Sequence, residues 1–184
     1  MKVVDINQDL FSIIDLSVRQ DRMAQKQLFN RFSPRLLSIC RQYIPDMYQA
    51  EDVMIAAFMK IFSKLHTFER KGNFEAWIRR IAINESISFI RSTKPVPDGE
   101  EILNGLSDTH QTADLLYKDD YQNMIDSLPE GCKIVFNLYA IEGFRHLEIA
   151  EMLQISEGTS KSQLAYARRL LQNMINQENK TYNG

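Results

Sequence analysis

The sequence predicts an all-α protein made of two small helical domains joined by a flexible linker. Apolar residues recur at helical spacing in both halves, and no strand-like alternation appears in the first half. Between the halves, residues 92–113 lose this periodicity and contain two prolines, two glycines and several acidic residues. We therefore expect domains at residues 1–91 and 114–184, the second a helix-turn-helix resembling a winged helix without strands.

Five helical segments are expected in the first domain. The first two span residues 8–19 and 22–32. Ser33 and Pro34 form a cap followed by a proline at the first helical position, which predicts a third helix from there to Tyr43. Pro45 and Asp46 break that helix, a fourth helix covers residues 52–65, and a fifth ends near residue 91.

The break before the fifth helix and the helix itself combine aromatic and basic residues. Asn73 stands at the N-cap position, and the apolar positions that follow it have the i, i+3, i+4, i+7 spacing of an amphipathic helix. Arginines bind phosphates, and an aromatic face can stack on an unpaired base. The candidate single-strand contacts are Phe68, Arg70, Lys71, Asn73, Trp77, Arg80, Asn84 and Arg91. Composition alone favours the plainer interpretation, a core tryptophan beneath a solvated basic face.

The second domain begins with a helical pattern from about Leu116 to Leu128. Pro129 marks a boundary, and the next helix carries Leu138 and Tyr139 and ends at Gly143, which suits a C-terminal cap. A short helix follows, whose apolar residues are Leu147, Ala150 and Leu153.

A tight turn at Gln154–Ile155 and a cap at Ser156 then introduce a second, longer helix. Its inward stripe is predicted to be Ser160, Leu164, Ala167, Leu171 and Met174. The opposite face offers cations for phosphates and polar groups for base edges, as a major-groove helix needs. The candidate contacts are Ser156, Thr159, Lys161, Ser162, Gln163, Tyr166, Arg168 and Arg169. A purely structural helical hairpin is the alternative, but the short turn, cap and polar face together favour DNA reading.

Charge is distributed unevenly along the chain. The net charge is −2, yet residues 1–91 carry +4, residues 114–155 carry −5 and residues 156–184 carry +2. This asymmetry is compatible with nucleic-acid contacts at two separate places. The two cysteines are far apart and form no CxxC motif, and no signal peptide or membrane-length apolar run appears, so we expect a cytoplasmic protein.

Catalysis is not expected. The chain shows no phosphate-cradling glycine loop, no zinc-ligand spacing and no nucleophile–base pair, and its three histidines are scattered. We predict no catalytic residue, no metal site and no cofactor.

Two long motifs resemble the extracytoplasmic function (ECF) sigma factors of the sigma-70 family. The segment AEDV…AF.K.F.KL.TF…..F.AWI.RIA.N, continuing to Arg91, is similar to region 2 of the family. The segment LP…..VF.L…EG….EIAE.L.IS.GT.KS.L..AR..L, from Leu128 to Leu171, is similar to region 4. The order of the motifs and the linker between them also match, so the resemblance covers nearly the whole chain.

The resemblance implies a promoter-specificity subunit of RNA polymerase. Core polymerase would bind the helix that carries Asp52, Ile55, Ala56, Phe58 and Lys60. The loop at residues 68–73 and the following helix would open the minus-ten promoter element and capture a flipped base, and the helix from Ser156 would read the minus-thirty-five element. Family members are usually inhibited by an anti-sigma factor, often membrane-anchored, and we expect a monomer when the protein is free.

Several positions depart from the family pattern. Ile55 and Ala56 replace a usual glutamine–acid pair, Ser88 stands where an aspartate is frequent, Ser160 replaces an aliphatic residue and Gln163 replaces an arginine. The promoter sequence therefore cannot be transferred from relatives. A free-standing helix-turn-helix regulator is the main alternative, although no heptad run for dimerisation appears; a helical adaptor would leave the basic faces unexplained.

Overall fold

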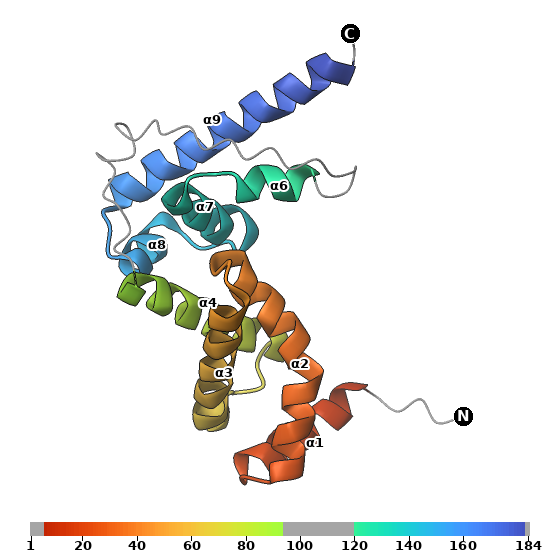
Figure 1. Ribbon diagram of the computed structural model, residues 1–184. Coiled ribbons are helices and arrows are strands. Elements are labelled where there is room, and N and C mark those ends of the chain that lie inside the picture. Colours follow the sequence, from red (N-terminus) through yellow and green to blue (C-terminus); the bar gives the residue numbers. More distant parts are fainter. Residues whose placement is uncertain (1–5, 94–119, 183–184) are drawn as a thin grey trace. The chain divides into compact units, whose positions relative to one another are not determined.

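The computed structural model describes residues 6–93 and 120–182 (Figure 1). Every regular element among these residues is helical, as the sequence predicts. The chain divides into two compact units, Met1–Thr93 and Lys94–Gly184. Ser92 and Thr93, which were assigned to the linker, still belong to a helix, and the rest of the predicted linker lies outside the described residues.

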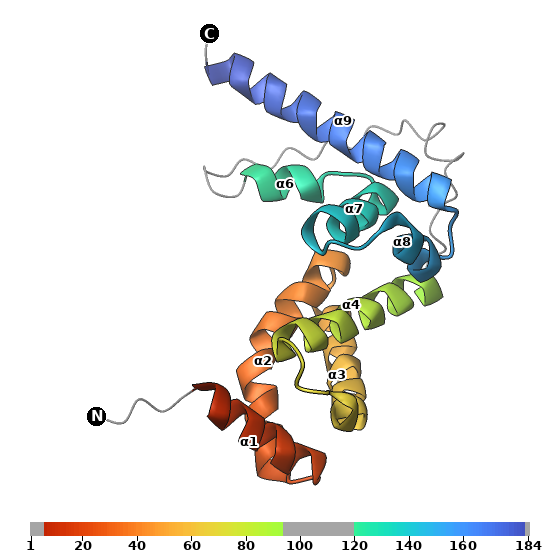
Figure 2. The same cartoon turned by 180° about the vertical axis from the view of Figure 1, so that it is seen from behind.

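Residues 6–93 of the first unit form four α-helices and one short 3-10 turn. They are α1 (Ile6–Val18), α2 (Arg22–Tyr43), α3 (Met47–Lys64), η1 (Leu65–Thr67) and α4 (Phe74–Thr93). Helices α2 and α3 lie side by side and α4 packs across both, while α1 packs on α2 (Figures 1 and 2). The centre of this bundle is aliphatic, and its fully buried side chains include Leu28, Leu36, Ile61, Ile83 and Ile87.

Aspartate caps set where the second and third helices begin. The Asp21 carboxylate accepts from the backbone N–H of Ala24 at 2.8 Å, and the Asp46 carboxylate accepts from that of Gln49 at 2.9 Å. Each satisfies a donor that has no partner inside its helix. Because Asp46 is the cap, α3 begins at Met47 rather than at the predicted Asp52.

The predicted helix break at Ser33–Pro34 is wrong, because α2 continues through both residues. A proline removes one intrahelical hydrogen bond and normally favours a helix start or a kink. Here the buried positions keep one unbroken helical stripe on both sides of the proline: Leu28, Phe32, Leu36, Ile39, Cys40 and Tyr43. Packing of this stripe against α3 and α4 stabilises a single helix where local signals predict two.

The second unit is built on one long helix. Its elements are α6 (Asp120–Asp126), α7 (Glu130–Phe136), the π-helical turn η2 (Asn137–Ile141), α8 (His146–Leu153) and α9 (Glu157–Tyr182). Helices α6, α7 and α8 all pack on α9. The core includes Cys132, Val135, Leu138, Ile149, Leu164 and Ala167. No strand, and therefore no wing, occurs in the described part of this unit.

Turn chemistry in the second unit follows the sequence at two places. Gly143 has φ +76° after the π turn, and the N–H of Phe144 donates to the carbonyl of Leu138 at 2.9 Å, which closes the helix end. Gln154 adopts the left-handed conformation, with φ 58°, between α8 and α9. Leu147, by contrast, is 60% exposed and not part of the core; Ile149 takes that place in α8.

Candidate nucleic-acid interface

The loop between η1 and α4 is held by its backbone conformation and by a cap. Gly72 has φ +152°, and a side chain there would be strained although the space around it is open. Arg70 takes the left-handed conformation with φ 59°, which is uncommon for a residue with a side chain. The Asn73 side chain accepts from the backbone N–H of Glu75 at 2.8 Å, as predicted for the cap of α4.

Trp77 belongs to an aromatic cluster beneath this loop. Its ring lies 5.5 Å from that of Phe68 and stacks on that of Phe74 at 5.8 Å between centroids. Phe74 in turn meets Phe32 of α2 edge-on at 5.5 Å. Phe74 is buried, whereas Phe68 and Trp77 are half-buried. The cluster therefore supports the loop and also leaves part of two aromatic rings accessible to an unstacked base.

Both cations of the loop are paired with carboxylates. The Arg70 guanidinium forms an ion pair with Asp15 of α1 and lies 5.7 Å above the Phe11 ring. Lys71 pairs with Glu69 inside the loop at 3.3 Å between Nζ and Oε2. Sequence reasoning missed Asp15, because 55 positions separate it from Arg70 and no local pattern connects them.

The polar face of α4 is exposed as predicted. Arg80, Asn84 and Arg91 are all solvent-exposed, and their spacing places them on one side of the helix. Together with Ser88, which is also exposed, they form a polar and basic strip that extends from the aromatic cluster.

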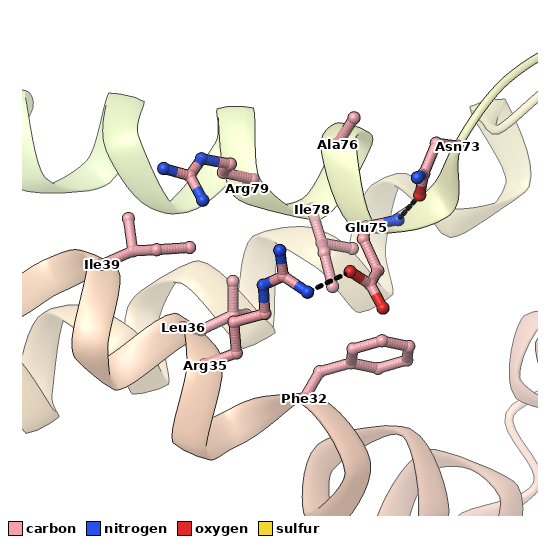
Figure 3. Close-up of a pocket in the computed structure, with 9 residues that line it drawn as sticks. All are labelled: Phe32, Arg35, Leu36, Ile39, Asn73, Glu75, Ala76, Ile78 and Arg79. Atoms are coloured by element: carbon pink, nitrogen blue, oxygen red, sulfur yellow. Dashed lines mark hydrogen bonds and ion pairs between the residues drawn. The ribbon is translucent and has the colours of Figure 1, made fainter. Parts of the chain in front are cut away.

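A small pocket of about 140 Å³ lies between α2 and α4, next to the Asn73 cap (Figure 3). Figure 3 shows Arg35 and Glu75 pointing toward one another, and their charged atoms are 2.5 Å apart. The pocket is lined by Phe32, Arg35, Leu36, Ile39, Asn73, Glu75, Ala76, Ile78 and Arg79. Its volume is below the roughly 300–1,000 Å³ typical of small-molecule sites, so we assign it no ligand.

Helix α3 presents four of the five predicted polymerase contacts to solvent. Asp52, Ile55 and Ala56 are exposed, and exposed Lys60 pairs with Glu85 of α4 at 2.5 Å. Two further exposed residues, Tyr48 and Met59, extend this face at helical spacing.

Phe58 differs from the other four, because it is only 3% exposed. Its ring packs against Phe29 at 4.7 Å and Phe62 at 5.8 Å between centroids. The position therefore supports α3 from inside the bundle, and any contribution of Phe58 to a partner surface is indirect. Met59, its neighbour in sequence, is 69% exposed and was missed.

The turn between α8 and α9 has the geometry of a helix-turn-helix. The Ser156 hydroxyl accepts from the backbone N–H of Thr159 at 2.9 Å, and the two hydroxyl oxygens lie 2.8 Å apart. At the other helix, the Glu148 carboxylate accepts from the backbone N–H of Arg145 at 2.9 Å. These caps fix the start of both helices and so the direction in which α9 leaves the turn.

The outer face of α9 carries the predicted cations. Lys161, Ser162, Arg168 and Arg169 are exposed and Tyr166 is half-buried. The guanidinium of Arg169 lies 5.0 Å from the Tyr166 ring centroid and that of Arg168 lies 5.6 Å from the Tyr139 centroid, which holds both over aromatic faces.

Lys161 is paired within its own helix. Its ammonium is 2.6 Å from the Glu157 carboxylate, one turn earlier. The hydrogen bond and positive charge of Lys161 lower the pKa of Glu157 below its ordinary value. The pair orients Lys161 near the first turn of α9, the part of a recognition helix that approaches the groove.

Gln163 does not lie on the outer face. It is 1% exposed and its amide packs against Gly131 of α7, where an added Cβ would lie 3.2 Å from Nε2. The prediction that Gln163 contacts bases is therefore not supported by its position. On the helix, residue 163 lies between the inward stripe and the outer face of α9. Because α7 packs against α9 there, the Gln163 side chain is buried on the inward side.

A polar joint connects the two helices of the helix-turn-helix. Ser160 is fully buried, as the inward stripe predicts, and its hydroxyl lies 2.9 Å from Nδ1 of His146 at the start of α8. The His146 ring stacks on Tyr139 at 4.5 Å between centroids. The serine that departs from the family pattern thus has a partner that sequence spacing did not identify.

Sequence comparisons identify the class of protein to which these two units belong. Residues 28–95 match the family model for Sigma-70 region 2 and residues 118–171 match that for Sigma-70, region 4. The chain therefore belongs to the sigma-70 family of transcription initiation factors.

Full-length relatives place the chain in the ECF group of that family. It is 22% identical to the ECF RNA polymerase sigma-E factor of Haemophilus influenzae, covering 89% of this chain and 94% of the relative. It is 24% identical to the ECF RNA polymerase sigma factor SigW of Bacillus subtilis, covering 84% of this chain and 90% of the relative. It is 26% identical to the RNA polymerase sigma-H factor of Pseudomonas aeruginosa, covering 86% of this chain and 90% of the relative.

Two solved structures of complexes are also similar. One is the sigma factor RpoE with the anti-sigma factor NepR from Bartonella quintana, at 23% identity, TM-score 0.49, and coverage of 82% of this chain and 96% of that one. The other is CnrH with the cytosolic domain of CnrY, at 20% identity, TM-score 0.49, and coverage of 89% of this chain and 95% of that one.

None of the helices within residues 6–93 and 120–182 is both long and apolar enough to cross a bilayer. Among the described residues, no group of three or more histidine, cysteine, aspartate or glutamate side chains is arranged to hold a metal ion.

Proposed function

We propose that this protein binds core RNA polymerase, directs it to a specific set of promoters and helps to open them. The observation that carries the proposal is the occurrence of both sigma-70 regions in one chain, each with an exposed basic face next to aromatic side chains. The chemistry is recognition without catalysis, so the chain's own residues position DNA and polymerase but break no bond. Such a protein would act in the cytoplasm, where polymerase and chromosome meet.

The first unit would recognise the minus-ten element as a single strand. The half-buried rings of Phe68 and Trp77 offer a stacking surface, and Arg80, Asn84 and Arg91 extend it along α4 with groups that bind phosphate and base edges. Stacking tolerates any base, so sequence preference would come from the polar groups of the strip and of the loop.

The second unit would read the minus-thirty-five element as duplex. Lys161, Arg168 and Arg169 would contact phosphates, and Ser162 and Tyr166 lie on the same exposed face of α9 to reach base edges. Because Gln163 is buried, base reading falls to fewer side chains than the sequence suggested.

Core polymerase would bind the exposed side of α3. Ile55 is 50% exposed and Met59 is 69% exposed, and both share one face of α3 with Asp52, with exposed Ala56 beside them. A face of this composition is more apolar than a glutamine–acid pair would make it, so desolvation would contribute more to polymerase binding here than polar contacts. Membership of the family also supports an anti-sigma factor as a further partner, membrane-anchored or not.

The direct test is run-off transcription from genomic fragments with purified core polymerase. We expect discrete new start sites when wild-type protein is added, and loss of these start sites with Ile55→Lys, a change on an exposed position that leaves the core intact. A gel-shift with duplex fragments and no polymerase serves as the comparison. Tight specific duplex binding by the protein alone, with no polymerase-dependent start, would instead indicate a free-standing regulator.

A further inference from the structure

Helix α1 supplies a negative charge to the loop that is proposed to hold the melted strand. The Asp15 carboxylate pairs with the Arg70 guanidinium, which also lies over the Phe11 ring, and α1 packs on η1 just before the loop. This helix precedes residue 28, where the match to region 2 begins. The contact is therefore made by a part of the chain that the region 2 match does not include.

Pairing changes what the loop presents to DNA. Its two cations, Arg70 and Lys71, each face a carboxylate, Asp15 and Glu69 respectively, so the four charges cancel. A phosphate that approaches Arg70 meets the negative Asp15 at the same place, and like charges repel. The loop therefore attracts a polyanion less strongly than its sequence alone suggests.

The Asp15–Arg70 pair is also open to exchange. The two side chains are 47% and 50% exposed, so water screens their attraction and the pair contributes little stability. A phosphate group can replace the carboxylate as the partner of Arg70 at little cost, which makes Asp15 a competitor for DNA rather than a permanent block.

We propose that Asp15 of α1 is an intramolecular competitor of single-stranded DNA at Arg70, and that it lowers the affinity of the free protein for unpaired strands. The inference rests on the proposed role of the loop in binding the minus-ten strand. Its consequence is selectivity: strand capture requires the additional contacts that a promoter complex supplies, and occasional single strands are held weakly.

The test uses full-length protein and a fluorescein-labelled single-stranded oligodeoxynucleotide of mixed sequence, titrated by anisotropy at several KCl concentrations. Asp15→Asn should tighten binding by about 1.4- to fivefold, the range that exposed ion pairs contribute. It should also steepen the dependence of log K on log salt by at most about 0.7, one phosphate contact on a single strand. Arg70→Gln should weaken binding and flatten that dependence.

The double variant isolates the pair. In the Arg70→Gln background, Asp15→Asn should tighten binding clearly less than it does in the wild-type background, because only the general repulsion of phosphate by Asp15 remains and the cation that it masks is gone. Glu51→Gln, a half-buried position on α3 in the same unit, removes an equal charge and has no ion-pair partner among the described residues, so it should leave affinity and salt dependence unchanged. Trp77 fluorescence melts show that each variant is folded.

The outcomes distinguish a failure of the Asp15 competition from a failure of the loop's proposed contact with DNA. If Asp15→Asn leaves binding unchanged or weakens it while Arg70→Gln weakens it, the loop binds DNA but the competition is refuted. If Asp15→Asn tightens binding equally with and without Arg70, its effect is general electrostatics and the competition is again refuted. If Arg70→Gln changes nothing, the loop's proposed contact with the strand fails, and the competition fails with it.

Discussion

Substitution of Phe58 by alanine tests whether α3 contacts polymerase through its core residue or through its surface. Phe58 is 3% exposed and packs on Phe29 and Phe62, whereas Met59 beside it is 69% exposed. A buried phenylalanine truncated to alanine costs about 3–5 kcal/mol, because apolar contacts are lost and a cavity remains. An exposed substitution usually changes stability by less than about 0.5 kcal/mol.

The cost of Phe58→Ala is large relative to the free energy of unfolding of one small unit. A domain of this size has a free energy of unfolding of roughly 5–10 kcal/mol, so Phe58→Ala should remove about half of it. At about 4–8 °C per kcal/mol, the melting temperature should fall by more than about 10 °C. Met59→Ala should leave both quantities near the wild-type values.

Urea titration followed by tryptophan fluorescence measures this directly. Trp77 is the only tryptophan in the chain, so its fluorescence reports on the first unit. Polymerase affinity is then measured at a temperature where both variants are folded. We expect Met59→Ala to bind polymerase more weakly without a loss of stability, and Phe58→Ala to lose stability while its folded fraction binds normally. A stability loss below about 1 kcal/mol for Phe58→Ala would refute the packing argument.

Three further predictions concern DNA and the second unit. Lys161→Ala should weaken duplex binding across sequences and flatten the salt dependence by about 0.9, one phosphate contact, in a salt-series gel-shift; a changed base preference at unchanged slope would contradict its phosphate role. Arg80→Ala should slow open-complex formation, followed by permanganate reactivity, more than it weakens upstream duplex binding; equal losses would reject the single-strand assignment. Burial raises the pKa of the Cys132 thiol from 9.0 to about 11, so the folded state favours the neutral thiol. The resulting contribution to stability is complete below pH 9.0 and declines as pH rises toward 11. In urea unfolding followed by circular dichroism, the free energy of unfolding should therefore fall more steeply over this pH range in wild type than in Cys132→Ala.

The fold class and the order of its elements could be predicted because they depend on local signals. Helical spacing of apolar residues, the Asn73 and Ser156 caps, and the left-handed glycine at position 143 are all encoded within a few residues of one another. The exposed basic face of α9 follows from the same periodicity. Where a local signal and the tertiary contacts disagreed, as at Pro34, the contacts decided: a continuous buried stripe on both sides outweighed one lost hydrogen bond.

Tertiary structure alone decided which side chains meet across helices. Periodicity could not show that Phe58 faces Phe29, that Gln163 turns toward Gly131, or that His146 accompanies Ser160, since each contact joins residues on different elements. The Asp15–Arg70 pair is the clearest case, because its two charges lie on different elements of the fold, α1 and the loop before α4. The sequence by itself therefore determined that this chain has two basic helical faces, and packing determined that the Arg70 cation in the loop beside one of them is already paired.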